Sequence, residues 1–490
     1  GMDFPIQIDR TSGVSLQRQL TEQLRRAILD GRLSAGMRLP ATRSLAATVG
    51  VSRNVALAAY DELFAEGYVE GRHGSGTYVS GDLPSLPRPS LPAPVGVPRW
   101  VRPPPPGPDP EPAINGAIEF RLGRPFTTPL PADVWRRVWN DVSNQLPPAD
   151  YREPSGDPEL RTAIAGYLRR SRGVACGADD VIVTAGAIQA LDLIARAVLI
   201  PGDRVGFEEP GYPLARQVLQ SRGAELVPIG VDDDGMRVDE LPVGRDAPIV
   251  VYVTPSHQYP LGARMPISRR VALIEWAGAN DSLVVEDDYD SEFRFDAPPL
   301  PAMTGLDKTG RVAYIGTFSK VLSPALRVGY LVAPPPLRER VVQYKRLTDY
   351  HTPWPVQRAL ATFIIEGHLE RHIRRMRRHY GDRRAALADA LQPASGVARL
   401  RGLEAGLHAF LELDNRINPR EVAERALAHH VIVSTTDSYS LGTPVHNGLL
   451  VGYGGLEIAQ IRDGAGVLVK AILDCMQGDV NVTCRHSIGR

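Results

Sequence analysis

One face of a helix is marked near the start of the chain by an apolar residue at every fourth position: Leu16, Leu20, Leu24, Ile28. We expect Gly31 to end this helix. Shorter helices are predicted over residues 41–49 and 53–66, since a glycine follows each of them. Ser52 stands where an N-cap belongs, because its hydroxyl can accept from a free backbone N–H of the first turn.

Two short apolar segments follow these helices, at residues 68–70 and 77–79. They flank the glycine-rich residues 74–76, a pattern that predicts a β-hairpin. Residues 12–80 are therefore expected to form a small α+β domain of three helices and a hairpin.

Short β-branched segments bounded by turn residues mark a second block: residues 181–184, 249–253, 283–285 and 312–316. Helical stretches separate them, which predicts an α/β domain with a parallel sheet buried on both faces. From about residue 356, long helices precede short strands and indicate a smaller α+β subdomain. We therefore expect one domain over 115–475, with its large part at about 150–355 and its small part at about 356–475.

Proline-rich sequence separates the two blocks. Thirteen prolines lie between Pro84 and Pro112, so this stretch can neither form a helix nor bury a core. Residues 81–114 are predicted to be an extended, semi-rigid linker; a proline-rich recognition segment is the minor alternative. Residues 476–490 are expected to be a loose tail.

Composition narrows the class of protein. A chain of 490 residues is expected to hold two or three domains. No apolar run reaches the roughly 20 residues that span a membrane, and the start lacks a signal-peptide core. Three scattered cysteines predict neither a disulfide framework nor a metal site, so a cytoplasmic location is expected. Net charge is zero, yet residues 31–60 contain four arginines and no acidic residue.

The segments LPATRSLA at residues 39–46, GVSRN at 50–54 and GSGTYV at 74–79 resemble the winged helix-turn-helix of GntR-family transcription regulators. A helix that opens with Ser52, Arg53 and Asn54 can present them to the major groove, where arginine reads guanine and asparagine reads adenine. The residues expected to contact double-stranded operator DNA are Arg43, Ser44, Ser52, Arg53, Asn54, Arg72 and Gly74. The alternative is that Arg43, Arg53 and Arg72 are solvated surface charges.

Two further segments each close a predicted strand: EDDYDSEF at residues 286–293 and TFSK at 317–320, with LRVGY at 326–330. A buried lysine such as Lys320 can form a Schiff base with the aldehyde of pyridoxal phosphate. Asp287 can keep the pyridine nitrogen of that cofactor protonated. Its phosphate can be bound by Thr317, Ser319 and Arg327.

These segments resemble fold-type I aminotransferases, and most closely the MocR/GabR subfamily of GntR regulators, over about residues 14–475. The resemblance implies that Lys320 is the aldimine lysine, that Asp287 meets the ring nitrogen, and that Tyr289 reaches the phenolic oxygen. The remaining roles it implies are stacking on the ring by Tyr212, a phosphate cradle of Ala187, Ile188 and Gln189, and a contact from Tyr151 to the phosphate of a dimer partner. The tyrosines are alternatively packing residues.

Two departures from the aminotransferase pattern bear on function. Tyr259 stands where those enzymes place an asparagine for the phenolic oxygen, which leaves Tyr289, with His257 or Gln258, for that contact. No arginine lies between Arg425 and Arg462 to clamp a substrate carboxylate, and Leu214 occupies a position where some relatives have arginine. Pyridoxal phosphate itself, or an amine without a carboxylate, is therefore the expected effector.

The sequence thus predicts a homodimeric, head-to-tail, ligand-responsive DNA-binding regulator that depends on pyridoxal phosphate. A catalytically active aminotransferase, or one limited to a half-reaction, is the alternative. A purely architectural DNA-binding protein is the third hypothesis. The seven arginines of residues 371–384 are expected to be solvated helix charges, or else a second contact to the DNA backbone.

Overall fold

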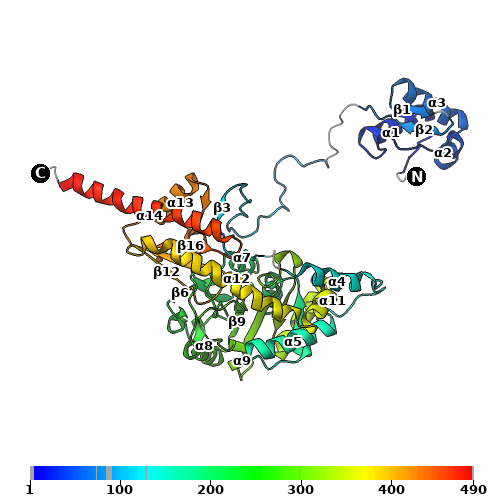
Figure 1. Ribbon diagram of the computed structural model, residues 1–490. Coiled ribbons are helices and arrows are strands. Elements are labelled where there is room, and N and C mark those ends of the chain that lie inside the picture. The colour runs from blue at the N-terminus through cyan, green and yellow to red at the C-terminus, as the bar shows by residue number, and fades with distance from the viewer. Residues whose placement is uncertain (1–4, 73, 84–90, 127–129, 297, 488–490) are drawn as a thin grey trace. The chain divides into compact units, whose positions relative to one another are not determined.

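The computed structural model describes residues 5–72, 74–83, 91–126, 130–296 and 298–487, without the side chains of 479–487 (Figure 1). The chain divides into two compact units, residues 1–103 and 104–490, which are described separately. No helix among the described residues is long and apolar enough to cross a membrane.

The first unit packs three helices against a two-stranded hairpin. Its elements are α1 (Leu16–Leu29), α2 (Thr42–Val49), α3 (Arg53–Ala65), β1 (Val69–Arg72) and β2 (Gly76–Val79). Leu20, Leu24 and Ile28 are buried in its core, as their fourfold spacing predicts. The hydroxyl of Ser52 accepts from the N–H of Val55 and caps α3. The predicted helices and hairpin are thus present.

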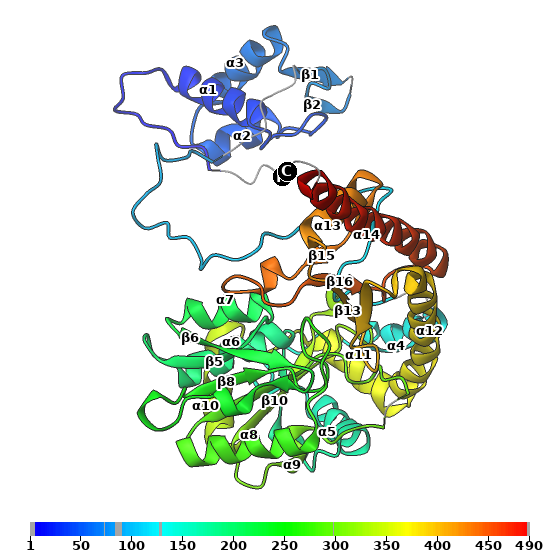
Figure 2. The same ribbon diagram turned by 90° about the vertical axis from the view of Figure 1, so that its left-hand side faces the viewer.

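An eight-stranded sheet forms the centre of the second unit (Figure 2). Its strands are β4 (Val181–Thr184), β5 (Arg204–Glu209), β6 (Glu225–Asp232), β7 (Gly235–Met236), β8 (Val250–Val253), β9 (Leu283–Asp288), β10 (Val312–Thr317) and β11 (Gly329–Val332). They lie in the order β4-β11-β10-β9-β8-β5-β6-β7. The strands β11 and β7 run antiparallel to their neighbours, so the sheet is mixed, whereas the sequence predicts a parallel one.

Helices cover both faces of this sheet (Figure 2). They are α5 (Pro158–Arg172), α6 (Ala187–Val198), α7 (Pro213–Ser221), α8 (Ile267–Asn280), α9 (Met303–Leu306) and α10 (Pro335–Thr348). Along β4, Ile182 joins the apolar core shared with α6, while Val181 and Val183 join the core on the other face. Because both faces are buried, the strands read as continuous apolar runs rather than alternating ones.

The smaller part of this unit contains a four-stranded sheet and long helices. Its elements are α11 (Trp354–Ile365), α12 (His368–Leu391), β12 (Ala398–Arg401), β13 (His408–Leu413), α13 (Pro419–Ala428), β15 (Ser434–Thr435), β16 (Gly448–Gly452) and α14 (Ile458–Ser487). A separate pair joins β3 (Ile118–Glu119) to β14 (Val431–Ile432). Before the large sheet, α4 (Ala132–Ser143) packs on α11.

The prediction of a loose tail is wrong for residues 476–487, which continue α14. This segment has no proline, and the single Gly478 does not end a helix that already has many turns. Residues 488–490 lie outside the described part of the chain.

The proline-rich linker is extended where it is described, and its later residues pack against the second unit. The amide of Gln217 on α7 donates to the carbonyl of Pro105 (2.9 Å). The guanidinium of Arg121 donates to the carbonyls of Glu111 and Pro112. The chain that leaves the first unit is therefore held beside α7.

Candidate functional site

The first turn of α3 presents polar side chains to solvent. Ser52, Arg53 and Asn54 are exposed, as are Arg43 and Ser44 on α2. Neither of these arginines has an ion-pair partner among the described residues, so both guanidiniums are available to a ligand. The first N–H groups of a helix and its dipole also favour an anion at this end.

The hairpin carries one more of the predicted contacts. Arg72 ends β1, donates to Glu70 (3.0 Å) and lies over the ring of Tyr78 (4.6 Å). These contacts hold its guanidinium at the surface of the hairpin. Gly74 has φ +74, in the left-handed region that suits glycine, and nothing lies within 4 Å of where a Cβ would stand. Both residues can therefore reach a nucleic-acid backbone beside the hairpin.

A cavity of about 400 Å³ lies at the carboxyl ends of the central strands of the second unit. All predicted cofactor residues except Gln189 and Tyr151 line it: Ala187, Ile188, Tyr212, Asp287, Tyr289, Thr317, Ser319, Lys320 and Arg327. Ligands of open α/β sheets bind at this edge, because loops from several strands converge there.

Lys320 and Asp287 supply the reactive groups of this cavity. Burial lowers the pKa of Lys320, although the negative charges of Asp290 and Asp287 oppose the shift, and this favours the neutral, nucleophilic amine. Burial likewise raises the pKa of Asp287 to about 7. The Oδ2 atom of Asp287 accepts from Tyr252 (2.5 Å), whereas its buried Oδ1 atom has no hydrogen-bond partner. That free oxygen suits the ring N–H of pyridoxal phosphate.

The opposite end of the cavity can hold a phosphate. Helix α6 begins at Ala187, and the N–H groups of its first turn have no acceptor within the helix. Arg327 donates to the carbonyl of Ala185 (3.0 Å), and a Cβ at Gly186 would lie 2.3 Å from its guanidinium. Only glycine at position 186 therefore allows the cation to approach the start of α6. The residues present fit pyridoxal phosphate at both ends.

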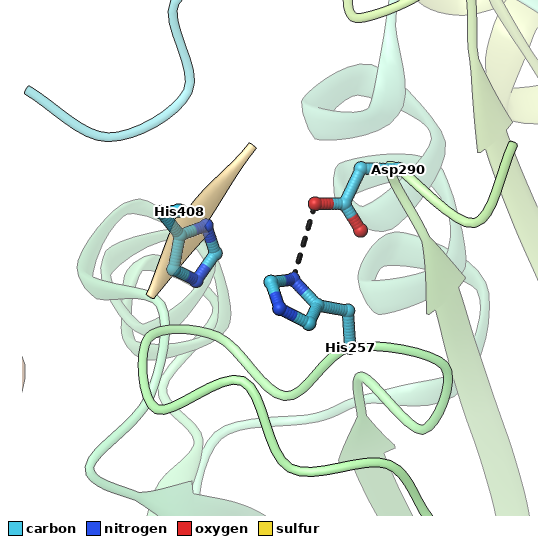
Figure 3. Close-up of side chains that lie close together, drawn as sticks. All are labelled: His257, Asp290 and His408. Carbon is cyan, nitrogen blue, oxygen red and sulfur yellow. Dashed lines mark hydrogen bonds and ion pairs between the residues drawn. The ribbon is translucent and has the colours of Figure 1, made fainter. Parts of the chain in front are cut away.

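Beneath Tyr289, three buried groups from separate segments meet: His257, Asp290 and His408 (Figure 3). Nδ1 of His257 lies 3.2 Å from Asp290, and Nε2 lies 3.0 Å from the carbonyl of Gly402. Burial alone would lower the pKa of His257, but Asp290 and the carbonyl reverse this and raise it. Because a carbonyl only accepts, Nε2 of His257 carries a proton.

These atoms lie within 4.8 Å of one another, a spacing that a metal ion could bridge. A metal would have to displace a proton from His257, however, and break its bond to Asp290 or to Gly402. The arrangement instead favours a buried hydrogen-bonded pair of His257 and Asp290 that supports Tyr289. The hydroxyl of Tyr289 donates to the carbonyl of His257 (2.7 Å) and lies 3.2 Å from Nδ1 of the same residue.

Gln189 does not reach the cavity, contrary to its predicted place in the phosphate cradle. Its amide oxygen accepts from Lys345 (2.7 Å), and its amide nitrogen donates to Asp349 (2.9 Å). The side chain of Lys345 is fully buried, and it also donates to Asp349 (2.7 Å) and to Thr352 (3.1 Å). Gln189 fixes the start of α6 against α10 instead.

Tyr151 also lies outside the cavity of its own chain. Its side chain is 67% exposed, and its ring stacks on Tyr350 at 4.3 Å.

His257 and Gln258, the other residues proposed to contact the phenolic oxygen, already have partners of their own. Both ring nitrogens of His257 are occupied, and the amide of Gln258 bonds the backbone of Pro210, Tyr259 and Leu261. Tyr289 alone of the three residues proposed for this contact lines the cavity.

Sequence reasoning missed several cavity residues: Leu122, Gly123, Tyr252, Thr254 and Pro324. Tyr252 belongs to the strand predicted at 249–253, and a period of two along that strand would have placed it beside Asp287. Leu122 and Gly123 carry no local signal, because they meet Lys320 from 197 residues away; its Nζ atom donates to the carbonyl of Gly123 (2.5 Å).

A carboxylate clamp is missing from the described lining, in which Arg327 is the only arginine. The interval between Arg425 and Arg462, which contains no arginine, includes β16, whose residues are all buried. Leu214 lines the cavity at the start of α7. A bidentate contact to a carboxylate therefore has no second guanidinium to form it.

Comparison with known proteins agrees with these two sites. Residues 16–79 match the family model of bacterial regulatory proteins, gntR family, and residues 127–445 match aminotransferase class I and II. Among solved structures, the kynurenine aminotransferase of Pyrococcus horikoshii is 29% identical with a TM-score of 0.68, covering 73% of this chain and 91% of its own. LysN, the α-aminoadipate aminotransferase of Thermus thermophilus, solved with N-(5'-phosphopyridoxyl)-L-leucine, is 26% identical with a TM-score of 0.67, covering 74% and 94%.

Three relatives that match most of this chain are named as regulatory proteins. The chain is 37% identical to the Probable rhizopine catabolism regulatory protein MocR of Rhizobium meliloti over 95% of each chain. It is 36% identical to the pyridoxine biosynthesis transcriptional regulator PdxR of Corynebacterium glutamicum, covering 94% and 96%. It is also 34% identical to the transcriptional regulator TauR of Rhodobacter capsulatus, covering 86% and 88%.

Fold and site together define a DNA-binding transcription regulator that carries a pyridoxal-phosphate-dependent, aminotransferase-like domain. The chain belongs to the MocR/GabR subfamily of gntR-family regulators. This confirms the predicted family, fold class and cofactor, and it favours the regulator over the active aminotransferase.

We expect Arg53→Ala to reduce affinity for operator DNA at least about tenfold, since a bidentate base contact contributes on the order of 1–3 kcal/mol. Fluorescence anisotropy with the DNA upstream of its own gene measures this. Arg18→Ala, which removes an exposed arginine from α1, is the matched control and should bind normally. The absorbance of bound cofactor should be unchanged in both variants, and unaltered DNA affinity in Arg53→Ala would contradict the assignment.

We expect Asp287→Asn to stabilise the cofactor-free protein at high pH. The pKa of Asp287 rises from 3.8 to about 7 on folding, so its stabilising contribution is complete below pH 3.8 and is lost as pH rises through 7. The melting temperature of the variant should exceed that of wild type by about 2–5 °C at pH 8, and by less at pH 5. Binding of pyridoxal phosphate should weaken at the same time.

The matched control for this prediction is Asp179→Asn, which neutralises a fully exposed carboxylate of the same domain. It should change neither the melting temperature nor cofactor binding. An equal gain for Asp287→Asn at both pH values would show that burial of this carboxyl does not determine the effect.

Proposed function

We propose that the regulator senses pyridoxal phosphate itself, or an amine that lacks a carboxylate, in the cavity around Lys320. The observation that carries this proposal is a cavity with cofactor-binding groups at both ends, among whose described lining residues Arg327 alone has a guanidinium. Arg327 lies beside Gly186 at the start of α6, where it would serve the cofactor phosphate. An amino-acid effector would leave its carboxylate without a partner in this cavity.

Each group of the cavity has a defined task in this proposal. Pyridoxal phosphate supplies an aldehyde and an electron-withdrawing ring when bound. Lys320 offers an amine at Nζ whose pKa is lowered because burial disfavours its charged form. Asp287, with Tyr252 fixing one of its oxygens, would hold the ring nitrogen through the free Oδ1 atom. The hydroxyl of Tyr289, supported by the His257–Asp290 pair, would orient the ring.

A route from this cavity to the DNA-binding unit follows the linker. Leu214 lines the cavity at the start of α7, and Gln217 on the same helix holds Pro105. Lys320 donates to Gly123, which lies shortly after the segment anchored through Arg121. Engagement of Lys320 by a ligand would change the first of these contacts directly. We infer that ligand binding alters how firmly residues 105–123 are held, and thereby biases operator binding.

We further propose a homodimer formed through the large domain, which would read two operator half-sites, direct or inverted. The exposed Tyr151, stacked on Tyr350 and turned from its own cavity, supports a contact to the cofactor phosphate of a partner.

We expect pyridoxal phosphate to change the affinity for operator DNA at least several-fold, because coupling between sites typically amounts to about 1–3 kcal/mol. The test titrates cofactor-free protein with pyridoxal phosphate while anisotropy of labelled operator DNA is followed. Lys320→Ala should bind DNA without responding. If the cofactor binds and DNA affinity stays constant, pyridoxal phosphate is a fixed prosthetic group, and a panel of amines without carboxylates becomes the test.

Gln217→Ala separates sensing from transmission in the same assay. This variant should bind pyridoxal phosphate with wild-type affinity and show a smaller DNA response, because it loses the bond to Pro105. Gln220→Ala, on the same helix α7, is the matched control. A full response in Gln217→Ala would remove α7 from the route.

We expect sedimentation velocity at micromolar concentration to show a dimer, and Tyr151→Ala to retain it while binding pyridoxal phosphate about tenfold more weakly, as for a lost contact to a charged group. Tyr344→Ala, which removes another tyrosine from the large domain, should leave cofactor affinity unchanged. A monomeric wild-type protein would contradict the proposed dimer.

A further inference from the structure

A second recess, of about 250 Å³, lies between the C-terminal end of α5, the N-terminal half of α12 and the segment that follows β9. Five arginines contribute to its wall: Arg170, Arg172, Arg294, Arg374 and Arg377. An ion pair between Arg170 of α5 and Glu370 of α12 closes one side of it. None of its lining residues belongs to the cavity around Lys320.

The arginines of this recess outnumber the acids that could neutralise them. Arg170 is paired with Glu370, and Arg172 with Asp288. Arg377 donates to the backbone carbonyl of Glu292, which leaves its positive charge uncompensated. Neither Arg294 nor Arg374 has a hydrogen bond or ion pair from its side chain to any described residue.

The surroundings of Arg294 show the excess of positive charge directly. Its half-buried guanidinium has a pKa below the ordinary value, first because of burial and then because Arg377, Arg172 and Arg264 are close. The one acid buried beside it offers little compensation, since burial raises the pKa of Glu292 to about 7. Ser291 adds a buried hydroxyl without a hydrogen-bond partner to the same wall.

We propose that this recess binds a small metabolite bearing a doubly charged oxyanion, either a phosphate ester or a dicarboxylate. Arginine forks match the oxygens of both groups, and Arg294, Arg374 and Arg377 retain free N–H donors for them. The DNA backbone is the other polyanion available to the arginines of α12. A concave wall that includes the buried Arg172 and Ser291 suits a small ligand better than a duplex.

The recess is connected to the cofactor cavity through strand β9. Asp287 and Asp288 are consecutive residues of this strand, so their side chains point to opposite faces of the sheet. Asp287 lines the cavity, whereas Asp288 bonds Arg172 (2.8 Å) in the wall of the recess. An anion beside Arg172 would compete with Asp288 for the positive charge of the Arg172 guanidinium. The electrostatic potential at Asp287 would change as a result. Binding in the recess should therefore alter the absorbance of bound cofactor.

The experiment titrates full-length protein, saturated with pyridoxal phosphate, with inorganic phosphate or with succinate in a calorimeter. Sodium chloride keeps the ionic strength constant. Because pyridoxal phosphate already fills the cofactor cavity, the added anion cannot bind at the phosphate position of that cavity. We expect saturable binding of at least one anion in the millimolar range. Arg374→Ala and Arg294→Gln should each weaken it at least about tenfold, the loss expected for hydrogen bonds between charged groups.

Arg378→Ala is the matched control, because Arg378 is exposed on α12 and lies outside the recess. It should bind the anion normally. Binding of phosphate alone identifies a phosphorylated ligand, and binding of succinate alone a dicarboxylate. No saturable binding, or equal losses in Arg374→Ala and Arg378→Ala, overturns the site. Lower operator affinity in Arg374→Ala without anion binding overturns it in favour of a DNA contact.

The link to the cofactor is read in the same samples from the cofactor absorbance. A change that saturates with the calorimetric signal, and that is lost in Arg374→Ala, supports it. Anion binding with constant absorbance overturns the link through Asp288. None of these readouts depends on a DNA response, so failure of the proposed sensing of pyridoxal phosphate would leave this test intact.

Discussion

The last two of three consecutive buried carboxylates at the end of β9 set the chemistry of the second unit. The alternation of a strand sends Asp287 and Asp288 to opposite faces of the sheet, where neither is solvated. Each needs its own partners, because an isolated buried charge is strongly disfavoured. Tyr252 of β8 donates to Asp287, while Arg172 of α5 and Tyr314 of β10 donate to Asp288. The neighbouring strands and α5 are thereby held around this one point.

Asp287 and Asp288 have different partners, and this difference explains why one serves the cofactor cavity and the other stabilises the opposite side of the sheet. Asp288 has a buried guanidinium beside it, whereas the hydrogen bond to Asp287 comes from a phenol. The raised pKa of Asp287 is therefore a cost to the ligand-free fold, which a basic ring nitrogen in the cavity would relieve. Such strain is typical of sites whose stability depends on a ligand, and it couples occupancy of the cavity to rigidity of β9.

Local sequence predicted the parts of the site that depend on neighbours in the chain. Lys320 and Asp287 follow short apolar strands, and the helices of the first unit begin and end at Ser52, Gly50 and similar signals. The position of a side chain that bonds a residue far away in the sequence could not be predicted. Gln189 reads as a phosphate ligand until Lys345, 156 residues later, takes its amide oxygen. The antiparallel β11 and the helical residues 476–487 were missed for the same reason, since short segments take their conformation from what they pack against.

The arginine distribution of this chain separates a sensor from an enzyme. An aminotransferase needs a guanidinium in its cavity to hold the substrate carboxylate through turnover, and the described lining offers Arg327 alone. The cavity nevertheless keeps a buried lysine and a carboxyl of raised pKa, the groups that would hold the aldehyde and the ring nitrogen of the cofactor. Guanidiniums without acidic partners gather instead in the recess on the other face of the sheet. Selection for a reversible signal rather than for turnover would favour that arrangement, because a ligand that exchanges without being converted reports its concentration through occupancy.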